Sequence, residues 1–229
     1  MSLSADTLYI VDDDAQARAA LVRLLRAAGY QTRAFGSASE FLEAHAHLER
    51  APGCLLLDLA MPEMSGLELQ QALCRAGCRR PIVFLSGRGD ISKSVRAMKG
   101  GAVNFLTKPV DARELFAAVE EALAIDAAER SAWVVRHGVV ERIATLTPRE
   151  RQVLGQLVSG KINKQIAAAL GTAEKTVKVH RSRVMRKMHA GSIVELVKLA
   201  SLVGIQSGIS PLLGASAPTA PAAVQPSRH

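Results

Sequence analysis

Several short apolar segments each end in a side chain that could take part in phosphate or metal chemistry. The run Leu55 to Leu57 leads directly into an aspartate, and other runs lead into aspartates, a serine or a lysine. The side chains at these ends are Asp12, Asp13, Asp14, Asp58, Ser86 and Lys108. Clustered carboxylates bind hard cations such as Mg²⁺, and a carboxylate beside a cation and a lysine can attack phosphorus to give an acyl phosphate. A lone aspartate there would more often be a helix cap, so the prediction of a phosphoacceptor rests on the whole set.

The apolar segments have the length and composition of buried parallel strands. They lie at 8–11, 55–57, 81–85 and 104–107. Amphipathic segments with capping residues alternate with them, and they predict helices at 15–28, from 37, after Gly66, at about 91–99, and from Asp111. Strands and helices that alternate in this way predict an α/β fold, a doubly wound five-stranded parallel sheet of flavodoxin-like order. In such a sheet ligands bind beyond the carboxyl ends of the strands, which is where these polar side chains stand.

The segment 6–125 resembles the receiver domain of two-component response regulators. The resemblance rests on Val11-Asp12-Asp13, on Leu57-Asp58-Leu59-Ala60-Met61-Pro62 followed by Gly66, on Leu85-Ser86-Gly87 and on Lys108-Pro109. It implies that Asp58 accepts the phosphoryl group and that Lys108 pairs with it. It implies that Mg²⁺ or Mn²⁺ is held by Asp12, Asp13, Asp58 and the backbone carbonyl of Ala60. It further implies that Ser86 and Phe105 act as a switch and that the Lys108-Pro109 bond is cis.

Composition limits the classes of protein to consider. The chain has 229 residues, enough for two small domains, and 48% of them are hydrophobic. No apolar run reaches the roughly 18 residues of a membrane helix, and the first residues lack the apolar core of a signal peptide. We therefore expect a cytoplasmic protein with no membrane partner. The three cysteines, Cys54, Cys74 and Cys78, are expected to be free thiols, and a metal or redox role is disfavoured.

The segment after the fifth predicted strand has a strong helical preference. Between Ala112 and Arg136 there is neither proline nor glycine, so we expect one long helix or two joined by a bend, with Gly138 as the first breaker. Two interpretations stay open for the predicted linker, residues 126–142. It is either a spacer whose Trp133-Val134-Val135 patch requires a partner, or a segment packed against one of the domains.

Positive charge is concentrated in the second half of the chain. Residues 147–206 carry eleven basic and three acidic side chains, which accounts for most of the net charge of +8. This distribution favours a nucleic-acid partner, although a solvated basic surface is the alternative. Helices are predicted at 148–160, 163–171, 174–189 and 192–203, and two short helices about a glycine turn are typical of a helix-turn-helix. On the third of them Val177, Val184 and Met188 share one face, and Lys175, Lys178, Ser182 and Arg186 share another.

Residues 143–206 resemble the LuxR-type helix-turn-helix of the NarL/FixJ class. The motifs are Leu146-Thr147 with Arg149-Glu150, Asn163-Lys164 with Ile166-Ala167, and the run from Lys175 to His180. The resemblance implies that Lys178, Val179 and Ser182 reach base edges, that Lys164, Thr176, Arg183 and Lys187 contact phosphates, and that Gln165 and Lys175 lie on the same DNA-binding surface. Ala173 stands where the class usually has serine, so either Thr172 caps the recognition helix or about 1 kcal/mol is lost. Ser192 is flanked by Gly191 and Ile193 instead of basic residues.

Together these expectations describe a receiver at 1–125, a helical linker at 126–142, an all-α helix-turn-helix domain at 143–206 and a disordered tail at 207–229. The chain is similar to FixJ- and StyR-like response regulators. The resemblance implies that a sensor histidine kinase phosphorylates Asp58 and thereby controls binding to promoter DNA, with RNA polymerase and, on phosphorylation, a second copy as further partners. Its only catalysis would be its own phosphorylation and dephosphorylation. A phosphotransfer relay and a regulator that works unphosphorylated are the alternatives.

Overall fold

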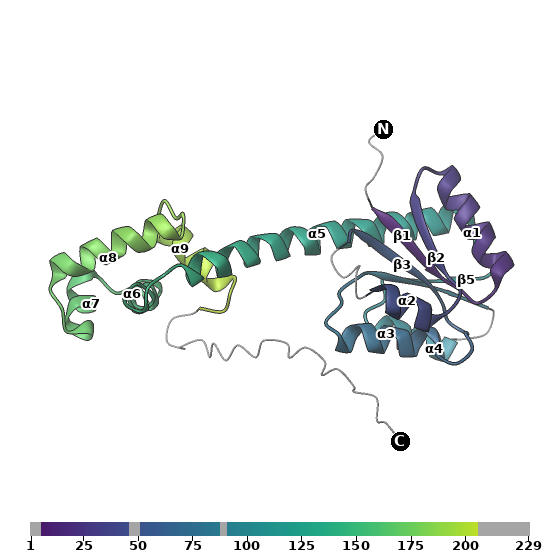
Figure 1. Cartoon of the computed structure of the whole chain (residues 1–229), viewed down its shortest axis with the longest axis horizontal. Coiled ribbons are helices and arrows are strands. Elements are labelled where there is room, and N and C mark those ends of the chain that lie inside the picture. The colour runs from purple at the N-terminus through teal and green to yellow at the C-terminus, as the bar shows by residue number, and fades with distance from the viewer. Residues whose placement is uncertain (1–5, 46–50, 88–90, 206–229) are drawn as a thin grey trace, which may run out of the picture. The chain divides into compact units, whose positions relative to one another are not determined.

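The structure, a computed structural model, describes residues 6–45, 51–87 and 91–205 (Figure 1). They fall into two compact units, Met1–Ala132 and Trp133–His229, which are described separately. The predicted disordered tail lies outside the described residues. None of the helices described is both long and apolar enough to cross a membrane.

The first unit is built on a parallel sheet with the strand order β2-β1-β3-β4-β5. Its strands are β1 (Thr7–Val11), β2 (Gln31–Phe35), β3 (Gly53–Asp58), β4 (Ile82–Ser86) and β5 (Asn104–Thr107). The predicted flavodoxin-like fold is confirmed. β3 is buried along its whole length because it lies in the centre of the sheet, which explains its continuous apolar run. β2 lies at an edge and is largely exposed, so it has no such run.

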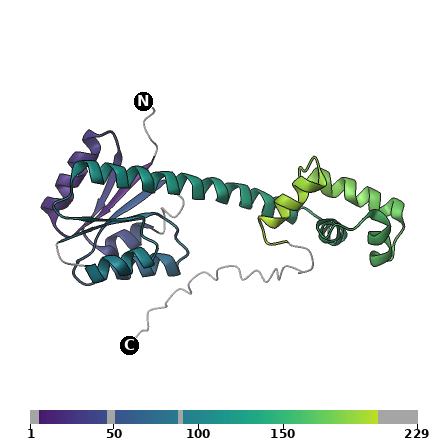
Figure 2. The same ribbon diagram turned by 180° about the vertical axis from the view of Figure 1, so that it is seen from behind.

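Helices cover both faces of this sheet (Figures 1 and 2). They are α1 (Ala15–Ala27), α2 (Ala38–His45), α3 (Gly66–Arg75), α4 (Ile91–Lys99) and α5 (Ala112–Ala144). Alternate residues of each strand point to opposite faces. Tyr9 and Leu57 belong to the core under α2, α3 and α4, whereas Leu8 and Leu56 belong to the core under α1 and α5.

The helix α5 differs from the prediction because it continues through Gly138 to Ala144. A glycine inside a helix costs about 1 kcal/mol relative to alanine. The next turns offset that cost, since Val139 and Ile143 are buried in the core of the second unit and Arg142 donates to the Gly138 carbonyl. Earlier in the helix, the buried Asp126 accepts a hydrogen bond of 3.0 Å from the Gly53 backbone and joins α5 to the start of β3.

The second unit holds the end of α5 and the helices α6 (Pro148–Val158), α7 (Asn163–Leu170), α8 (Glu174–Lys187) and α9 (Ile193–Ser201). Its core includes the predicted inward residues Val177 and Val184 of α8 and Met188, the C-cap residue that follows the helix. Thr147 and Glu150 form the predicted capping box at α6. Gly171 ends α7 with φ of 61°, a left-handed conformation that favours glycine.

Candidate phosphorylation site and nucleic-acid interface

The register of the sheet brings the predicted side chains of the first unit to one edge. Val11 pairs with Leu57 across β1 and β3, so the aspartates that follow them, Asp12 and Asp58, leave the sheet at the same level. Ser86 pairs with Thr107 across β4 and β5, which places Lys108 at the next position along that edge. All these residues stand at carboxyl ends of parallel strands, where α/β folds bind ligands.

Lys108 joins the two buried carboxylates of this edge. Its ammonium donates to Asp12 at 2.7 Å and also to Asp58, and the two carboxylate side chains are only 1% and 8% exposed. Burial disfavours the charged ammonium, but the hydrogen bonds to Asp12 and Asp58 outweigh this effect and raise the pKa of Lys108. The lysine therefore stays protonated, and the peptide bond that follows it, to Pro109, is cis.

The carboxylates are less closely gathered than the sequence suggested. Asp13 is exposed, and among the described residues its side chain has no hydrogen-bond or ion-pair partner. In the same part of the chain no three histidine, cysteine or acidic side chains converge as a metal-binding group. Lys108 bridges the Asp12 and Asp58 carboxylates, and Asp13 takes no part in this bridge. Asp58 also accepts a hydrogen bond of 2.7 Å from the Ala60 backbone N–H. Ala60 lies in the loop that follows β3.

Ser86 and Phe105 lie on adjacent strands next to this group. Ser86 is buried, and its hydroxyl donates to the Gly87 carbonyl at 3.2 Å. Phe105 is partly buried and stacks on Phe84, with ring centroids 6.4 Å apart. The serine carbonyl accepts from the Lys108 backbone N–H at 2.6 Å, which ties the ends of β4 and β5 together.

Two further residues shape this edge. A Cβ at Gly66 would lie 2.3 Å from the Asp58 carbonyl oxygen, so only glycine permits the close approach of α3 to the acceptor. Gly66 belongs to the predicted receiver motif, whereas Arg18 was not predicted to lie here; its guanidinium donates to the Asp12 carbonyl at 2.6 Å. The sequence signal that could have indicated Arg18 is its position, one turn into the helix that follows the acidic segment.

In the second unit most of the predicted DNA-contacting side chains are exposed on α7 and α8. The exposed ones are Lys164, Gln165, Lys175, Thr176, Lys178, Val179, Ser182 and Arg183. Val179 is 46% exposed, although it is apolar. The Gln165 side chain accepts from the Ile162 backbone N–H and is therefore partly engaged. These helices thus offer a basic surface with one apolar side chain, which suits a phosphate backbone and base edges.

Lys187 differs from the other predicted phosphate contacts. Its ammonium donates to the buried Glu150 carboxylate at 2.7 Å and to the Thr145 carbonyl at 2.9 Å. Because its donors already meet acceptors inside the unit, the geometry favours a structural role for Lys187.

Comparisons with known proteins agree with both units. Residues 8–120 match the response regulator receiver domain, and residues 144–200 match the bacterial regulatory proteins of the luxR family. Nodulation protein W of Bradyrhizobium diazoefficiens is 42% identical over 200 residues, which are 87% of each chain. The chain belongs to the two-component response regulators.

Two further relatives of the regulator support this assignment. The transcriptional regulatory protein FixJ of Azorhizobium caulinodans is 42% identical over 86% of the regulator and 93% of its own chain. A solved structure of the response regulator StyR is 43% identical, with a TM-score of 0.77 over 86% of the regulator and 99% of that chain. The regulator therefore combines a receiver with a LuxR-type DNA-binding domain, and its relatives are regulators of transcription.

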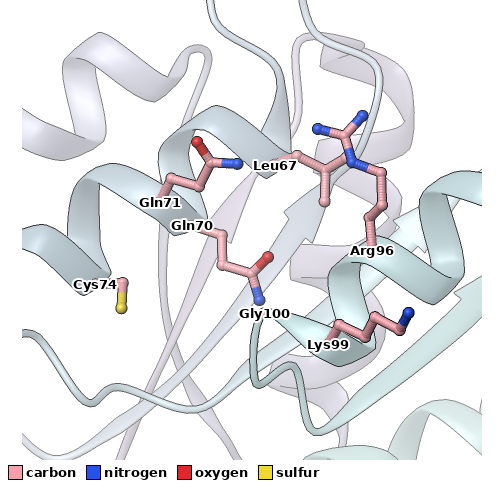
Figure 3. A pocket seen from close by; sticks show the side chains of 7 residues that line it. All are labelled: Leu67, Gln70, Gln71, Cys74, Arg96, Lys99 and Gly100. Atoms are coloured by element: carbon pink, nitrogen blue, oxygen red, sulfur yellow. The ribbon is translucent and has the colours of Figure 1, made fainter.

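The regulator also has a hollow of about 300 Å³ between α3 and α4 (Figure 3). It is lined by Leu67, Gln70, Gln71, Cys74, Arg96, Lys99 and Gly100. Gln70 donates to the Ala97 carbonyl at 3.0 Å, and a Cβ at Gly100 would lie 2.6 Å from its amide oxygen. The hollow is thus closed on one side by a helix-to-helix contact, and it contains none of the carboxylates at the strand ends.

Proposed function

We propose that Asp58 is the residue phosphorylated by a sensor histidine kinase and that its phosphorylation controls sequence-specific DNA binding by the second unit. The observation that carries this proposal is the group formed by Asp58, Asp12 and Lys108 at the end of the central strand. A buried carboxylate that accepts from an ammonium is oriented, as a nucleophile must be. We keep the domain bounds predicted from the sequence, which are 1–125 for the receiver, 126–142 for the linker and 143–206 for the DNA-binding domain.

The chemistry is a transfer of a phosphoryl group to an oxygen of Asp58. A bond forms between that oxygen and phosphorus, and the bond from phosphorus to the donor, a phosphohistidine or acetyl phosphate, breaks. The Lys108 ammonium neutralises charge on the transferred group. Attack of water on the acyl phosphate reverses the modification, so self-phosphorylation and self-dephosphorylation are the only catalysis we assign. Ser86 and Phe105 are the proposed switch residues, which respond to the phosphoryl group at the end of β3.

Receiver domains bind Mg²⁺ at the phosphorylated site, and the donor set of this chain fits such an ion. Asp12 and Asp58 offer two carboxylates at the strand ends, and Asp13, which follows Asp12 in the chain, offers a third that is exposed. Hard oxygen donors with excess negative charge suit Mg²⁺ or Mn²⁺. We assign Asp12, Asp13, Asp58 and the Ala60 carbonyl as the residues that would hold it. The cation would supply positive charge to the transferring phosphoryl group.

We propose that the exposed surface of α7 and α8 binds promoter DNA. Lys178, Val179 and Ser182 are assigned to base edges. The phosphate contacts are assigned to Lys164, Thr176 and Arg183, with Gln165 and Lys175 on the same surface. RNA polymerase is the further partner expected of a protein that acts on transcription from such a site.

Mass spectrometry after treatment with acetyl phosphate and Mg²⁺ tests the acceptor. The wild type should gain one phosphoryl group, and Asp58→Asn should gain none because an amide cannot form the acyl phosphate. Asp13→Asn is the matched control, since it keeps the acceptor and should gain the same group more slowly. An adduct that persists in Asp58→Asn would overturn the assignment.

A mobility-shift titration with promoter DNA separates this proposal from the alternatives. Acetyl phosphate and Mg²⁺ should increase the affinity of the wild type and leave Asp58→Asn unchanged. Equal affinity with and without phosphorylation would favour a regulator that works unphosphorylated. Phosphorylation without any DNA binding would favour a phosphotransfer relay.

A further inference from the structure

Arg18 binds the backbone of the acidic turn from the first turns of α1. Its Nη1 donates to the Asp12 carbonyl at 2.6 Å and lies 3.4 Å from the Asp13 carbonyl, which it also contacts. We infer that Arg18 is a positioning residue for the phosphorylation site, because it fixes the turn that directs the Asp13 carboxylate toward a divalent cation. This inference rests on the proposed function and adds a residue to that site.

The two aspartates of the turn differ in how their side chains are held. The Asp12 carboxylate accepts from Lys108 at 2.7 Å and from the Asp14 backbone N–H at 2.9 Å. The Asp13 carboxylate is exposed and has no hydrogen-bond or ion-pair partner in the described part of the chain. The Asp13 backbone therefore sets the point from which this side chain projects, and no other group in the described part of the chain holds it. Arg18 is the side chain that contacts that backbone, through the Asp13 carbonyl.

The guanidinium of Arg18 lies near the loop between β2 and α2. A Cβ at Gly36 would lie 3.8 Å from both Cζ and Nη1 of Arg18, which is ordinary van der Waals distance. The Gly36 N–H in turn donates to the Glu40 carboxylate at 2.6 Å, so this loop is fixed as well. Arg18 thus binds the turn after β1 and lies near the loop after β2, both at the edge of the sheet where Asp58 ends β3.

The position of Arg18 makes two opposite effects on cation binding possible. Its positive charge repels a nearby cation, so its removal would tighten binding if charge were all that mattered. Its hydrogen bonds fix a ligand-bearing turn, so its removal should weaken binding if it positions the ligand. The sign of the change therefore distinguishes a positioning residue from a charge that is merely close by.

The test measures Mn²⁺ binding to the full-length protein by the loss of the electron paramagnetic resonance signal of free Mn²⁺, with Mg²⁺ as competitor. In Arg18→Met the dissociation constant should rise roughly tenfold, the lower end of the loss seen when residues that orient metal ligands are removed. Arg18→Lys keeps the charge but loses the planar fork, and its dissociation constant should rise as well. Arg23→Met is the matched control, because Arg23 is exposed on the same helix and has no partner among the described residues. It should bind Mn²⁺ as the wild type does.

A second readout separates the role of Arg18 from general damage to the fold. In Arg18→Met the Mg²⁺ concentration for half-maximal phosphorylation by acetyl phosphate should rise, while the rate at saturating Mg²⁺ stays near that of the wild type. Thermal unfolding without metal checks the fold, and Arg18→Lys serves if the methionine variant unfolds. Unchanged or tighter Mn²⁺ binding in Arg18→Met and Arg18→Lys would overturn the positioning role and leave the proposed function intact. A wild type that binds no Mn²⁺ would overturn the cation site and this role together.

Discussion

At the scale of single residues, the DNA-binding surface distinguishes contacts that read sequence from contacts that do not. Lys178 is exposed on α8, and Lys164 is exposed on α7. We expect Lys178→Ala to cost roughly 1–3 kcal/mol on the preferred site and to blur the preference, because a base contact is lost. We expect Lys164→Ala to weaken binding to all sequences about equally, because a phosphate contact is lost. The slope of log K against log salt concentration should become shallower by about one. Fluorescence anisotropy on specific and random duplexes measures both. Equal, sequence-independent losses in the two variants would show that α8 does not read bases.

The pair formed by Glu150 and Lys187 should stabilise the second unit. Glu150 is 2% exposed, and it accepts both from Lys187 and from the Thr147 backbone N–H. Lys187→Met keeps most of the side-chain volume but leaves the carboxylate without its cation. It should lower the free energy of unfolding by about 1.5–3 kcal/mol in urea titrations at neutral pH. Lys198→Met, an exposed change on α9, is the control. If Lys187→Met kept the full stability of the wild type and its DNA affinity depended less steeply on salt, Lys187 would instead be a phosphate contact.

The same pair gives a pH dependence of stability with a definite sign. The hydrogen bond from Lys187, with help from the Thr147 backbone, lowers the pKa of Glu150 from 4.5 to about 2. A carboxyl group whose pKa is lower in the folded state stabilises the protein above its unfolded pKa. This stabilisation should be complete above about pH 5 and should be lost as the pH falls from 4.5 toward 2. In the same urea titrations, Lys187→Met should lose less stability than the wild type across that range.

At the scale of elements, the recognition helix begins without a side-chain cap. Ala173 occupies the N-cap position of α8, and no side chain of the described residues accepts from the first turn, so Thr172 does not replace the missing serine. Ser192 does cap α9 by accepting from the Glu195 backbone N–H at 3.2 Å.

These two helix starts give a matched pair of substitutions. Ala173 has φ of −77° and ψ of 146°, which already suits a capping serine. Ala173→Ser should therefore raise the free energy of unfolding by about 1 kcal/mol, and Ser192→Ala should lower it by about the same amount. Chemical denaturation followed by far-ultraviolet circular dichroism measures both. No gain from Ala173→Ser would mean that a serine at position 173 does not reach the free N–H groups of the first turn.

At the scale of the whole molecule, we expect phosphorylation to act through association of two copies. A dimer would present two recognition helices to two half-sites about one turn apart, which supplies affinity that one small domain lacks. Phosphorylation shifts the equilibrium only by its different stabilisation of the two states, so the unphosphorylated protein should already sample the active form weakly while remaining mainly monomeric. Sedimentation velocity with and without beryllofluoride, a phosphoryl mimic, should show a monomer becoming a dimer that binds an inverted repeat more tightly. A monomer that gains DNA affinity would instead indicate release of an autoinhibited recognition helix.

The sequence by itself determined the architecture of the first unit and most of its chemical site. Parallel strands carry their polar residues to a common edge, so the positions of Asp12, Asp58 and Lys108 followed from three short apolar runs and their ends. The inward face of α8 and the capping box at Thr147 were likewise local patterns, legible from spacing alone.

Only the tertiary structure decided which long side chains are already engaged. Lys187 is basic and lies on the recognition helix, yet its partner Glu150 is 37 residues away. Asp126 accepts from Gly53 across 73 residues, and Arg18 donates to backbone carbonyls, which carry no sequence signature. The helix through Gly138 was decided in the same way, because burial of Val139 and Ile143 outweighs a local preference. Long flexible side chains can reach many acceptors, and the fold alone selects the one that is met.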